Sequence, residues 1–196
     1  MTPEDALKAL VNIQSKIDTA NAETLKEEHN LKLSYFNSLK ETMAERDTLI
    51  KEIDGFWEAV LCCSECAELL AEMDYREGQE ETSIDISWID EIIVEYREDF
   101  KYYVGIKAKE NAYFKNTLLE KEFSLFEGPE CISTQIEWKN KKLIENPLVR
   151  FFSSADSSDD DTNMAIFQLL SDIYFNAVYY YVRLPEDESD CCEHKH

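Results

Sequence analysis

The feature that most constrains the fold is a long N-terminal stretch without helix-breaking residues. After Pro3 there is no further proline until Pro129, and no glycine occurs before Gly55. Thr2 is a good helix cap and Pro3 suits the first helical position. Apolar side chains then recur at steps of three and four residues. The stretch predicts one helix of about 50 residues, roughly 75 Å long at 1.5 Å per residue.

Such a helix is too long for a chain of 196 residues to bury along its whole length. Its apolar stripe is narrow and suits a helical partner better than a core. The stripe becomes polar around Thr24 and Glu28, so two shorter helices joined near Asn21–Glu28 are the alternative. With one continuous helix, we expect a homodimer through the stripe residues Leu7, Leu10, Ile13, Ile17, Leu31, Tyr35, Leu39 and Met43.

Beyond the long helix, the apolar period changes from about 3.6 to 2 near Ile84. A further helix is predicted over 54–76, and a final helix over 162–182 with Asp161 or Thr162 as its cap. A linking segment over 139–150 precedes that final helix. Four strands of one antiparallel sheet are predicted between them, at 88–97, 100–109, 117–126 and 131–139. The predicted class is α+β, with a dimerisation helix over 1–53, an acidic domain over 54–183 and a short acidic, Cys- and His-containing tail over 184–196.

Charge is the strongest indication of the partner. The chain has 42 acidic and 20 basic residues, a formal net charge of −22. Such a surface repels nucleic acid and anionic membranes and attracts basic proteins. The sequence shows no secretory signal and no apolar run of the ~20 residues that a membrane span needs. We therefore expect an intracellular protein with reduced cysteines.

Residues that could support catalysis or bind metal are few. There are three histidines, His29 in the long helix and two in the tail, and no phosphate-binding glycine motif, so we predict no catalytic residue and no cofactor. Cys62 and Cys66 are spaced for one helical turn, but no second pair of ligands follows; we predict no metal site, with a metal-carrying protein as an alternative. The acidic residues after Ser157 and Ser158 make these two serines candidate phosphorylation sites.

Several short segments occur in a recognisable order. They are LVNIQSKID (10–18), AERDTLIKEIDGFW (44–57), ENAYFKNTLLEKEFSLF (110–126), IEWK (136–139) and FF (151–152), followed by a final helix that contains Tyr179 and Tyr180. In this order the sequence resembles the nucleosome assembly protein family, in particular its SET branch. The resemblance implies a non-catalytic histone chaperone of the nucleus and cytoplasm that assists nucleosome assembly. It also implies an antiparallel dimer of long helices, an earmuff-shaped domain, and inhibition of a serine/threonine protein phosphatase.

The resemblance places the histone-binding face on the underside of the domain, near the FF segment. We expect histone contacts at the acidic residues near the fourth strand and the final helix, with two on the first strand as a second choice. Glu91, Glu95, Glu120, Glu122 and Glu137 alternate with apolar residues, so we also expect repulsion between like charges on the sheet. A coiled-coil scaffold and a phosphatase regulator are the alternatives. The predicted histone-binding residues are Glu137, Glu145, Asp156, Asp159, Asp160 and Asp161, then Glu91 and Glu95.

Overall fold

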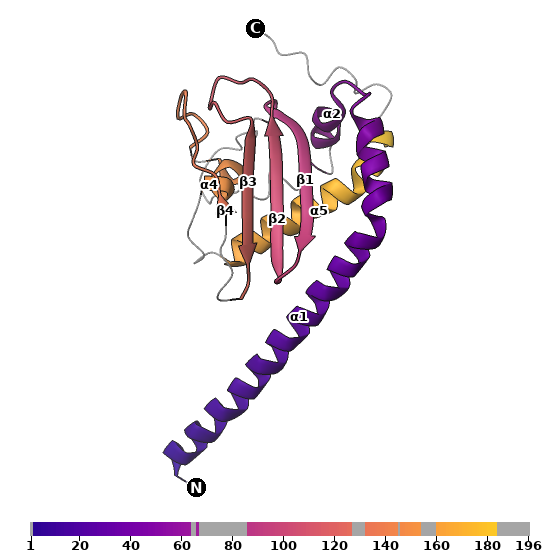
Figure 1. Ribbon diagram of the computed structural model, residues 1–196. Helices are drawn as coiled ribbons and strands as arrows, with labels where there is room; N and C mark the ends of the chain where they lie inside the picture. Colours follow the sequence, from indigo (N-terminus) through magenta and orange to yellow (C-terminus); the bar gives the residue numbers. More distant parts are fainter. Residues whose placement is uncertain are drawn as a thin grey trace.

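A computed structural model shows a long helical rod with an α+β domain at its C-terminal end (Figure 1). The structure describes residues 2–63, 66, 86–126, 132–144, 146–153 and 160–183. The order of elements confirms the predicted α+β class. A long helix comes first, and a four-stranded antiparallel sheet with flanking helices follows it.

Helix α1 spans Pro3–Ile50 and has no break near Asn21–Glu28, so the alternative of two shorter helices is wrong. The cap predicted at Thr2 is present. The Thr2 hydroxyl accepts a hydrogen bond from the Asp5 backbone N–H, and the Asp5 carboxylate accepts one from the Thr2 backbone N–H. This reciprocal pair, with Pro3 in the first turn, satisfies donors that a helix start leaves unpaired.

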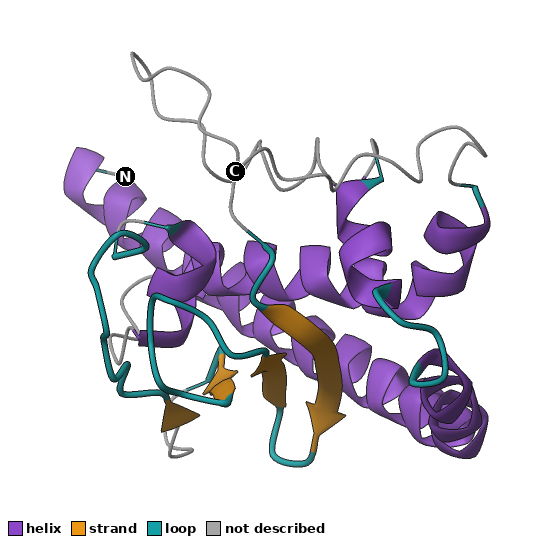
Figure 2. Ribbon diagram, turned by 90° about the horizontal axis from the view of Figure 1, so that it is seen from above, coloured by secondary structure: helices purple, strands orange, loops and turns teal. Residues whose placement is uncertain are grey.

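The sheet is a meander in the order β1-β2-β3-β4, and every neighbouring pair is antiparallel. Strand β1 spans Ile89–Arg97, β2 spans Lys101–Ala108 and β3 spans Leu118–Ser124. The alternation predicted for β1 is confirmed, since Ile92 and Val94 are buried on the face that packs against the helices. Figure 2 shows the helices on one side of this sheet.

The predicted fourth strand over 131–139 is wrong in its length. Strand β4 has only two residues, Ile132–Ser133, and an isolated bridge joins Phe114 to Trp138. The Thr134 side chain takes the place of the missing ladder, because its hydroxyl accepts from the Glu120 N–H and donates to the Glu120 carbonyl oxygen. Side-chain hydrogen bonds of this kind compete with strand pairing.

Helix α5, Asp160–Val182, packs against β1, β2 and α2. It begins at Asp160, so the caps predicted at Asp161 and Thr162 are wrong, and both residues lie inside the helix. The predicted linking segment is also partly helical, because α4 spans Pro147–Ser153. The Asn146 side chain accepts a hydrogen bond from the Val149 N–H at the start of α4, and a Pro in the first turn needs no donor partner.

The helix predicted over 54–76 is interrupted. Helix α2 spans Phe56–Cys62, and Cys63 has an extended backbone. The Cys63 sulfur accepts a hydrogen bond from the Cys66 N–H at 3.5 Å. Cys62 and Cys66 therefore do not lie one turn apart on a continuous helix, and most of the remaining predicted segment lies outside the described residues.

Candidate functional site

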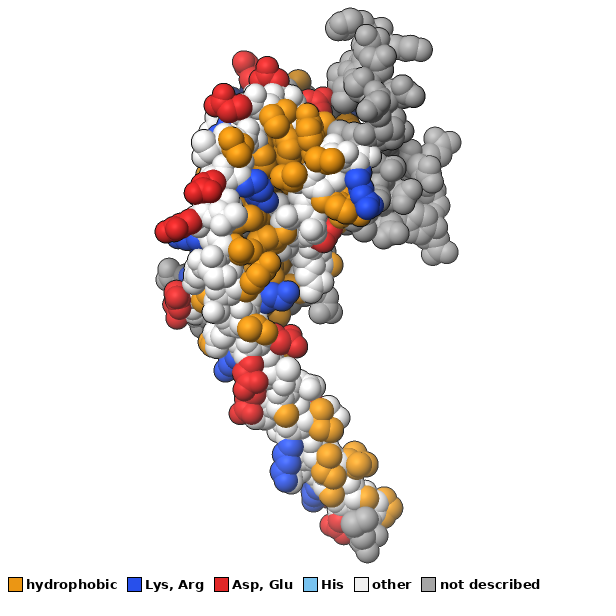
Figure 3. All heavy atoms as spheres, turned by 90° about the vertical axis from the view of Figure 1, so that its right-hand side faces the viewer, with side chains coloured by type: hydrophobic (Ala, Val, Ile, Leu, Met, Phe, Trp, Pro, Cys, Tyr) orange, Lys and Arg blue, Asp and Glu red, His pale blue; other side chains and the backbone are white. Residues whose placement is uncertain are grey.

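The N-terminal half of α1 extends away from the domain with its apolar side chains exposed. Leu7 and Leu10 are each 62% exposed and Leu31 is 71% exposed. Figure 3 shows apolar side chains along this part of the rod. Six of the eight residues predicted for dimerisation are exposed large side chains, namely Leu7, Leu10, Ile13, Ile17, Leu31 and Tyr35.

The other two predicted dimer residues lie closer to the domain. Leu39 is half-buried, and Met43 packs against the domain core. The Arg46 guanidinium donates to the Tyr174 carbonyl oxygen at 2.6 Å and holds α1 and α5 side by side. The exposed apolar surface of α1 therefore continues onto α5. Exposed apolar residues at this end are Leu49, Ile53, Val178, Tyr179 and Val182.

A second face of α1 is fixed to the domain by His29, which is only 2% exposed. Its Nε2–H donates to the Arg97 carbonyl oxygen at 2.9 Å, at the tip of the β1–β2 hairpin. The imidazole packs edge-on against the rings of Tyr96, Phe100 and Tyr102. A mid-helix histidine therefore has a structural role, as the contact between the rod and the sheet.

The acidic side chains on the outer face of the sheet are interleaved with basic ones. Lys107 and Lys51 bind Glu91 at 2.6 and 3.5 Å. Arg97 binds Glu95 at 2.7 Å and also bridges to Glu122, on β3 and on the same face, at 2.8 Å. For Glu91, Glu95 and Glu122 the expected repulsion between like charges is wrong, because each of these carboxylates is paired with a cation.

Glu122 is the most buried of these carboxylates, with a side chain 8% exposed. Burial alone raises the pKa of a carboxyl, but hydrogen bonds from Lys101 and Arg97, and their positive charges, outweigh it and place the pKa of Glu122 below its usual value. On the same face, burial and the nearby Glu120 carboxylate raise the pKa of Tyr103 to about 12. This face is a balanced ionic network and not a free acidic surface.

The other residues predicted for histone binding are placed unevenly. Glu137 is exposed on the segment after β4. Asp160 and Asp161 lie in the first turn of α5. Glu145, Asp156 and Asp159 lie outside the described residues, as do the candidate phosphorylation sites Ser157 and Ser158.

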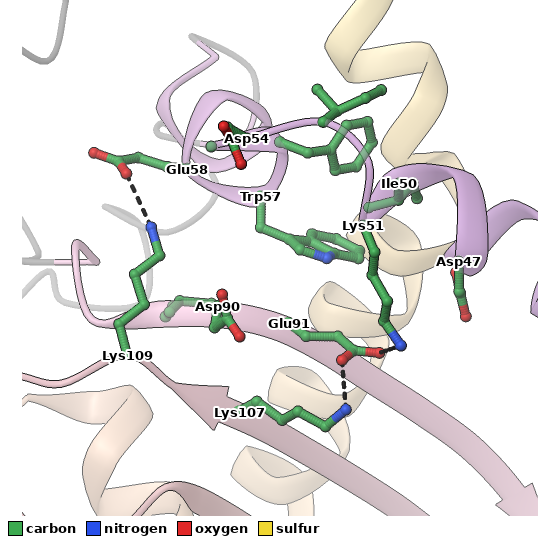
Figure 4. Close-up of a pocket in the computed structure, with 14 residues that line it drawn as sticks. Asp47, Ile50, Lys51, Asp54, Trp57, Glu58, Asp90, Glu91, Lys107 and Lys109 are labelled. Atoms are coloured by element: carbon green, nitrogen blue, oxygen red, sulfur yellow. Dashed lines mark hydrogen bonds and ion pairs between the residues drawn. The ribbon is translucent and has the colours of Figure 1, made fainter.

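Sequence reasoning missed a pocket of about 370 Å³ between the end of α1, the start of α2 and strands β1 and β2 (Figure 4). Trp57 forms part of its apolar wall, and Asp54 and Asp90 carry carboxylates at its margins. Asp54 and Trp57 are each separated from Asp90 by more than 30 positions in the sequence. The IDGFW and WIDE segments show the right residue types, but only the packing of α2 against β1 brings them together.

Within the described part of the chain, no group of three or more His, Cys, Asp or Glu side chains has an arrangement that could hold a metal ion. Cys62, Cys63 and Cys66 are free thiols. None of the described helices has the length and apolar character of a membrane span.

Comparisons with known proteins agree with this arrangement. No protein-family model matches the sequence. The chain is 28% identical over 215 residues to protein SET of Drosophila melanogaster, a match that covers 94% of this chain and 77% of that protein. It is 30% identical over 147 residues to NAP1-related protein 1 of rice, covering 72% of this chain and 53% of that protein.

Two solved structures from Plasmodium falciparum have the same fold. A nucleosome assembly protein superposes with a TM-score of 0.52 and 18% identity, over 93% of this chain and 98% of that one. Nucleosome assembly protein S superposes with a TM-score of 0.51 and 20% identity, over 89% of this chain and 99% of that one.

The long helix with its antiparallel sheet and covering helices therefore defines a nucleosome assembly protein fold. In sequence the chain is similar to protein SET and to NAP1-related protein 1, which agrees with the resemblance to the nucleosome assembly protein family and its SET-like branch.

Proposed function

We propose that this chain is a histone chaperone, which binds core histones through its acidic surfaces and assists nucleosome assembly and disassembly without catalysis. The observation that carries the proposal is the net charge of −22 on a chain with this fold. Histones are basic, and distributed carboxylates compete with DNA phosphates for the same lysine and arginine side chains. Transfer of histones to DNA then needs no nucleotide, because DNA is the stronger polyanion.

The proposed functional unit is a homodimer. Antiparallel pairing of two α1 helices, centred near Glu28, places the exposed residues Leu7–Ile17 of one helix against the C-terminal half of the other. That arrangement covers apolar side chains that the single chain leaves in water. It also mounts two acidic domains at the ends of one rigid rod.

The proposed histone contacts are the acidic residues near β4 and at the start of α5, on the side of α4. Glu137 is exposed there, and Asp160 and Asp161 begin α5. Glu91 and Glu95 are weaker candidates, because lysine and arginine side chains already balance their charges. The full proposed set is Glu137, Glu145, Asp156, Asp159, Asp160 and Asp161.

The proposal is tested by binding of purified core histones over a salt series. We expect affinity to fall steeply as salt rises, and we expect the protein to prevent precipitation of histones mixed with DNA. Neutralising the six proposed carboxylates should weaken binding about tenfold. The matched control neutralises five acidic residues of α1 and one just beyond its end, namely Asp18, Glu23, Glu27, Glu41, Glu45 and Glu52.

An equal loss in both six-residue variants would show that net charge alone matters and that the proposed surface is wrong. Absence of salt-dependent histone binding in the unaltered protein would contradict the chaperone function and leave a coiled-coil scaffold. The expected inhibition of a serine/threonine phosphatase rests on the resemblance and stays a prediction, and so does the placement in nucleus and cytoplasm.

A further inference from the structure

The pocket at the junction of rod and domain has the shape of a site for a single side chain or small ligand. Its volume of about 370 Å³ is near the lower end of the range for ligand pockets, roughly 300–1,000 Å³. The apolar part of its wall comes from Ile50, Trp57 and Ile89, on α1, α2 and β1 respectively. Because its wall combines residues of the rod with residues of α2, β1 and β2, the pocket exists only when the rod is docked on the domain.

Most of the charged side chains that line the pocket already have partners. Five carboxylates and three lysines contribute to the wall. The lysines are held by Glu91 and Glu58, and the Asp47 carboxylate is held by its neighbours Arg46 and Tyr174. The pairs are Lys51–Glu91, Lys107–Glu91, Lys109–Glu58, Arg46–Asp47 and Tyr174–Asp47.

Two carboxylates of the wall, Asp54 and Asp90, make no ion pair with any described residue. Both are exposed. Figure 4 shows Asp54 on the turn before α2 and Asp90 on β1, on opposite sides of the pocket, with Trp57 between them. The wall has five carboxylates and three lysines, so its net charge is negative and favours a cationic ligand.

Trp57 supplies a second and independent indication of a ligand. The side chain is only 5% exposed, and its indole N–H has no hydrogen-bond acceptor among the described residues. The nitrogen lies on the edge of the ring that faces the strand wall of the pocket (Figure 4). Among the described residues, the fully buried side-chain atom without a partner is His29 Nδ1, so the Trp57 nitrogen is not fully enclosed, and its N–H is an open donor on the pocket wall. An oxygen atom brought by a ligand, such as a peptide carbonyl, satisfies it.

We propose that this pocket binds the side chain of an arginine in a basic polypeptide. The planar guanidinium has five N–H donors, so it can bond Asp54 and Asp90 together and lie against the indole ring. A backbone carbonyl next to that arginine accepts from the Trp57 N–H. The proposal rests on the proposed histone-binding function and adds to it a specific site, far in sequence from β4 and the start of α5.

The placement of Asp54 and Asp90 on opposite sides of the pocket favours arginine over lysine. An ammonium is a compact, strongly hydrated point charge with no planar fork, so it matches one carboxylate at a time. A guanidinium is more weakly hydrated and loses less on entering a wall of apolar side chains. The pocket therefore discriminates between two residues that a diffuse acidic surface binds alike.

The test uses two short unstructured peptides that differ only in having four arginines or four lysines among glycine and serine. We measure their binding to the full chain by calorimetry at moderate salt, and the binding of core histones in parallel. The unaltered protein should bind the arginine peptide about tenfold more tightly. Asp54→Asn with Asp90→Asn should remove that preference. The matched control, Glu52→Gln with Glu110→Gln, changes the net charge equally at exposed residues outside the pocket and should keep it.

A third variant tests the indole donor. Trp57→Phe keeps an aromatic wall and removes the N–H, so the arginine preference should fall about threefold, with thermal melting followed to confirm folding. Equal binding of both peptides by the unaltered protein overturns the pocket, as does identical behaviour of the two double variants. Failure of the unaltered protein to bind core histones overturns the proposed function, whereas the peptide preference tests the pocket by itself.

Discussion

The two halves of α1 are parts of one regular helix, yet they have different surroundings. Before His29 the large apolar side chains of the helix are exposed, and the Lys26 ammonium lies over the rings of Phe100 and Phe126 at the edge of the domain. From His29 to Ile50, one face of the helix is buried on the domain. The two halves therefore show that the residues which favour helix formation are not the same as those which decide whether a helix face packs on the domain.

The residues that dock the helix repeat at intervals of seven. His29, Phe36, Met43 and Ile50 follow one another at that spacing, which is close to two helical turns and keeps them on one face. Phe36 contacts the rings of Tyr96 on β1 and Phe175 on α5. The stripe of the proposed dimer runs along a neighbouring face, so the helix uses one surface to dock on its own domain and leaves another exposed.

The largest expected effect is on the half that has no partner within the chain. Ile13→Asp with Ile17→Asp places two charges in the proposed helix–helix interface, so the dimer dissociation constant should rise on the order of 100-fold. Asn12→Asp with Thr19→Asp adds the same charge on another side of the helix and should leave the dimer intact. Sedimentation across a concentration series measures both; a dimer that survives the first pair would place the interface elsewhere.

The next prediction compares two residues two positions apart. His29→Ala removes the hydrogen bond to the Arg97 carbonyl and the contacts with three aromatic rings, and should lower the free energy of unfolding by about 2 kcal/mol. Leu31→Ala, on the exposed stripe, should change it by less than about 0.5 kcal/mol. Urea unfolding in the dimer-disrupted background separates the two, and similar losses would contradict the two-face description of α1.

Sequence reasoning recovered the parts of this molecule that depend on local periodicity. The uninterrupted helix, its cap at Thr2 and the alternation of β1 follow from side chains close together in the chain. Six of the eight residues predicted for the stripe are exposed, but Met43 packs against the domain core, because spacing alone does not show which of two adjacent apolar faces meets the domain.

What depends on distant residues was not predictable in the same way. The pairing of Arg97 with Glu122 and of Lys107 with Glu91 follows from strand register, so acids that look unbalanced in the sequence are balanced in space. The truncation of β4 depends on the Thr134 hydroxyl reaching Glu120. The pocket around Trp57 needs the rod, α2 and the sheet to be assembled first.

The pH dependence of the free energy of unfolding tests how the C-terminal half of α1 is held on the domain, because Arg97 contacts both α1 and the ionic network of the sheet. Its carbonyl binds His29 and its guanidinium binds Glu122. The pKa of Glu122 is lower in the folded chain than its usual value. Its contribution is therefore present above the unfolded-state pKa, about 4.3, and is lost as the pH falls through the lower folded-state pKa.

We expect the free energy of unfolding of the unaltered chain to decline below about pH 4.3 more steeply than that of Glu122→Gln, which has no carboxyl to protonate. Chemical unfolding at several pH values from neutral to acidic measures the difference. Glu110→Gln, at an exposed position, serves as the control and should follow the unaltered chain. Parallel pH profiles for the Glu122→Gln and unaltered proteins would contradict a favourable ionic role for this buried carboxylate.

The smallest effect is expected at the free end of the rod. Thr2→Ala removes the hydroxyl that accepts the Asp5 N–H, a change that costs a helix start about 1 kcal/mol. Because the large apolar side chains of the first turns are exposed, we expect this loss to appear as faster amide hydrogen exchange in the first turns of α1. The urea midpoint of the dimer-disrupted protein should not change. A midpoint shift as large as that of His29→Ala would mean that the two halves of α1 unfold as one cooperative unit with the domain. The two halves would then differ in their contacts but not in their stability.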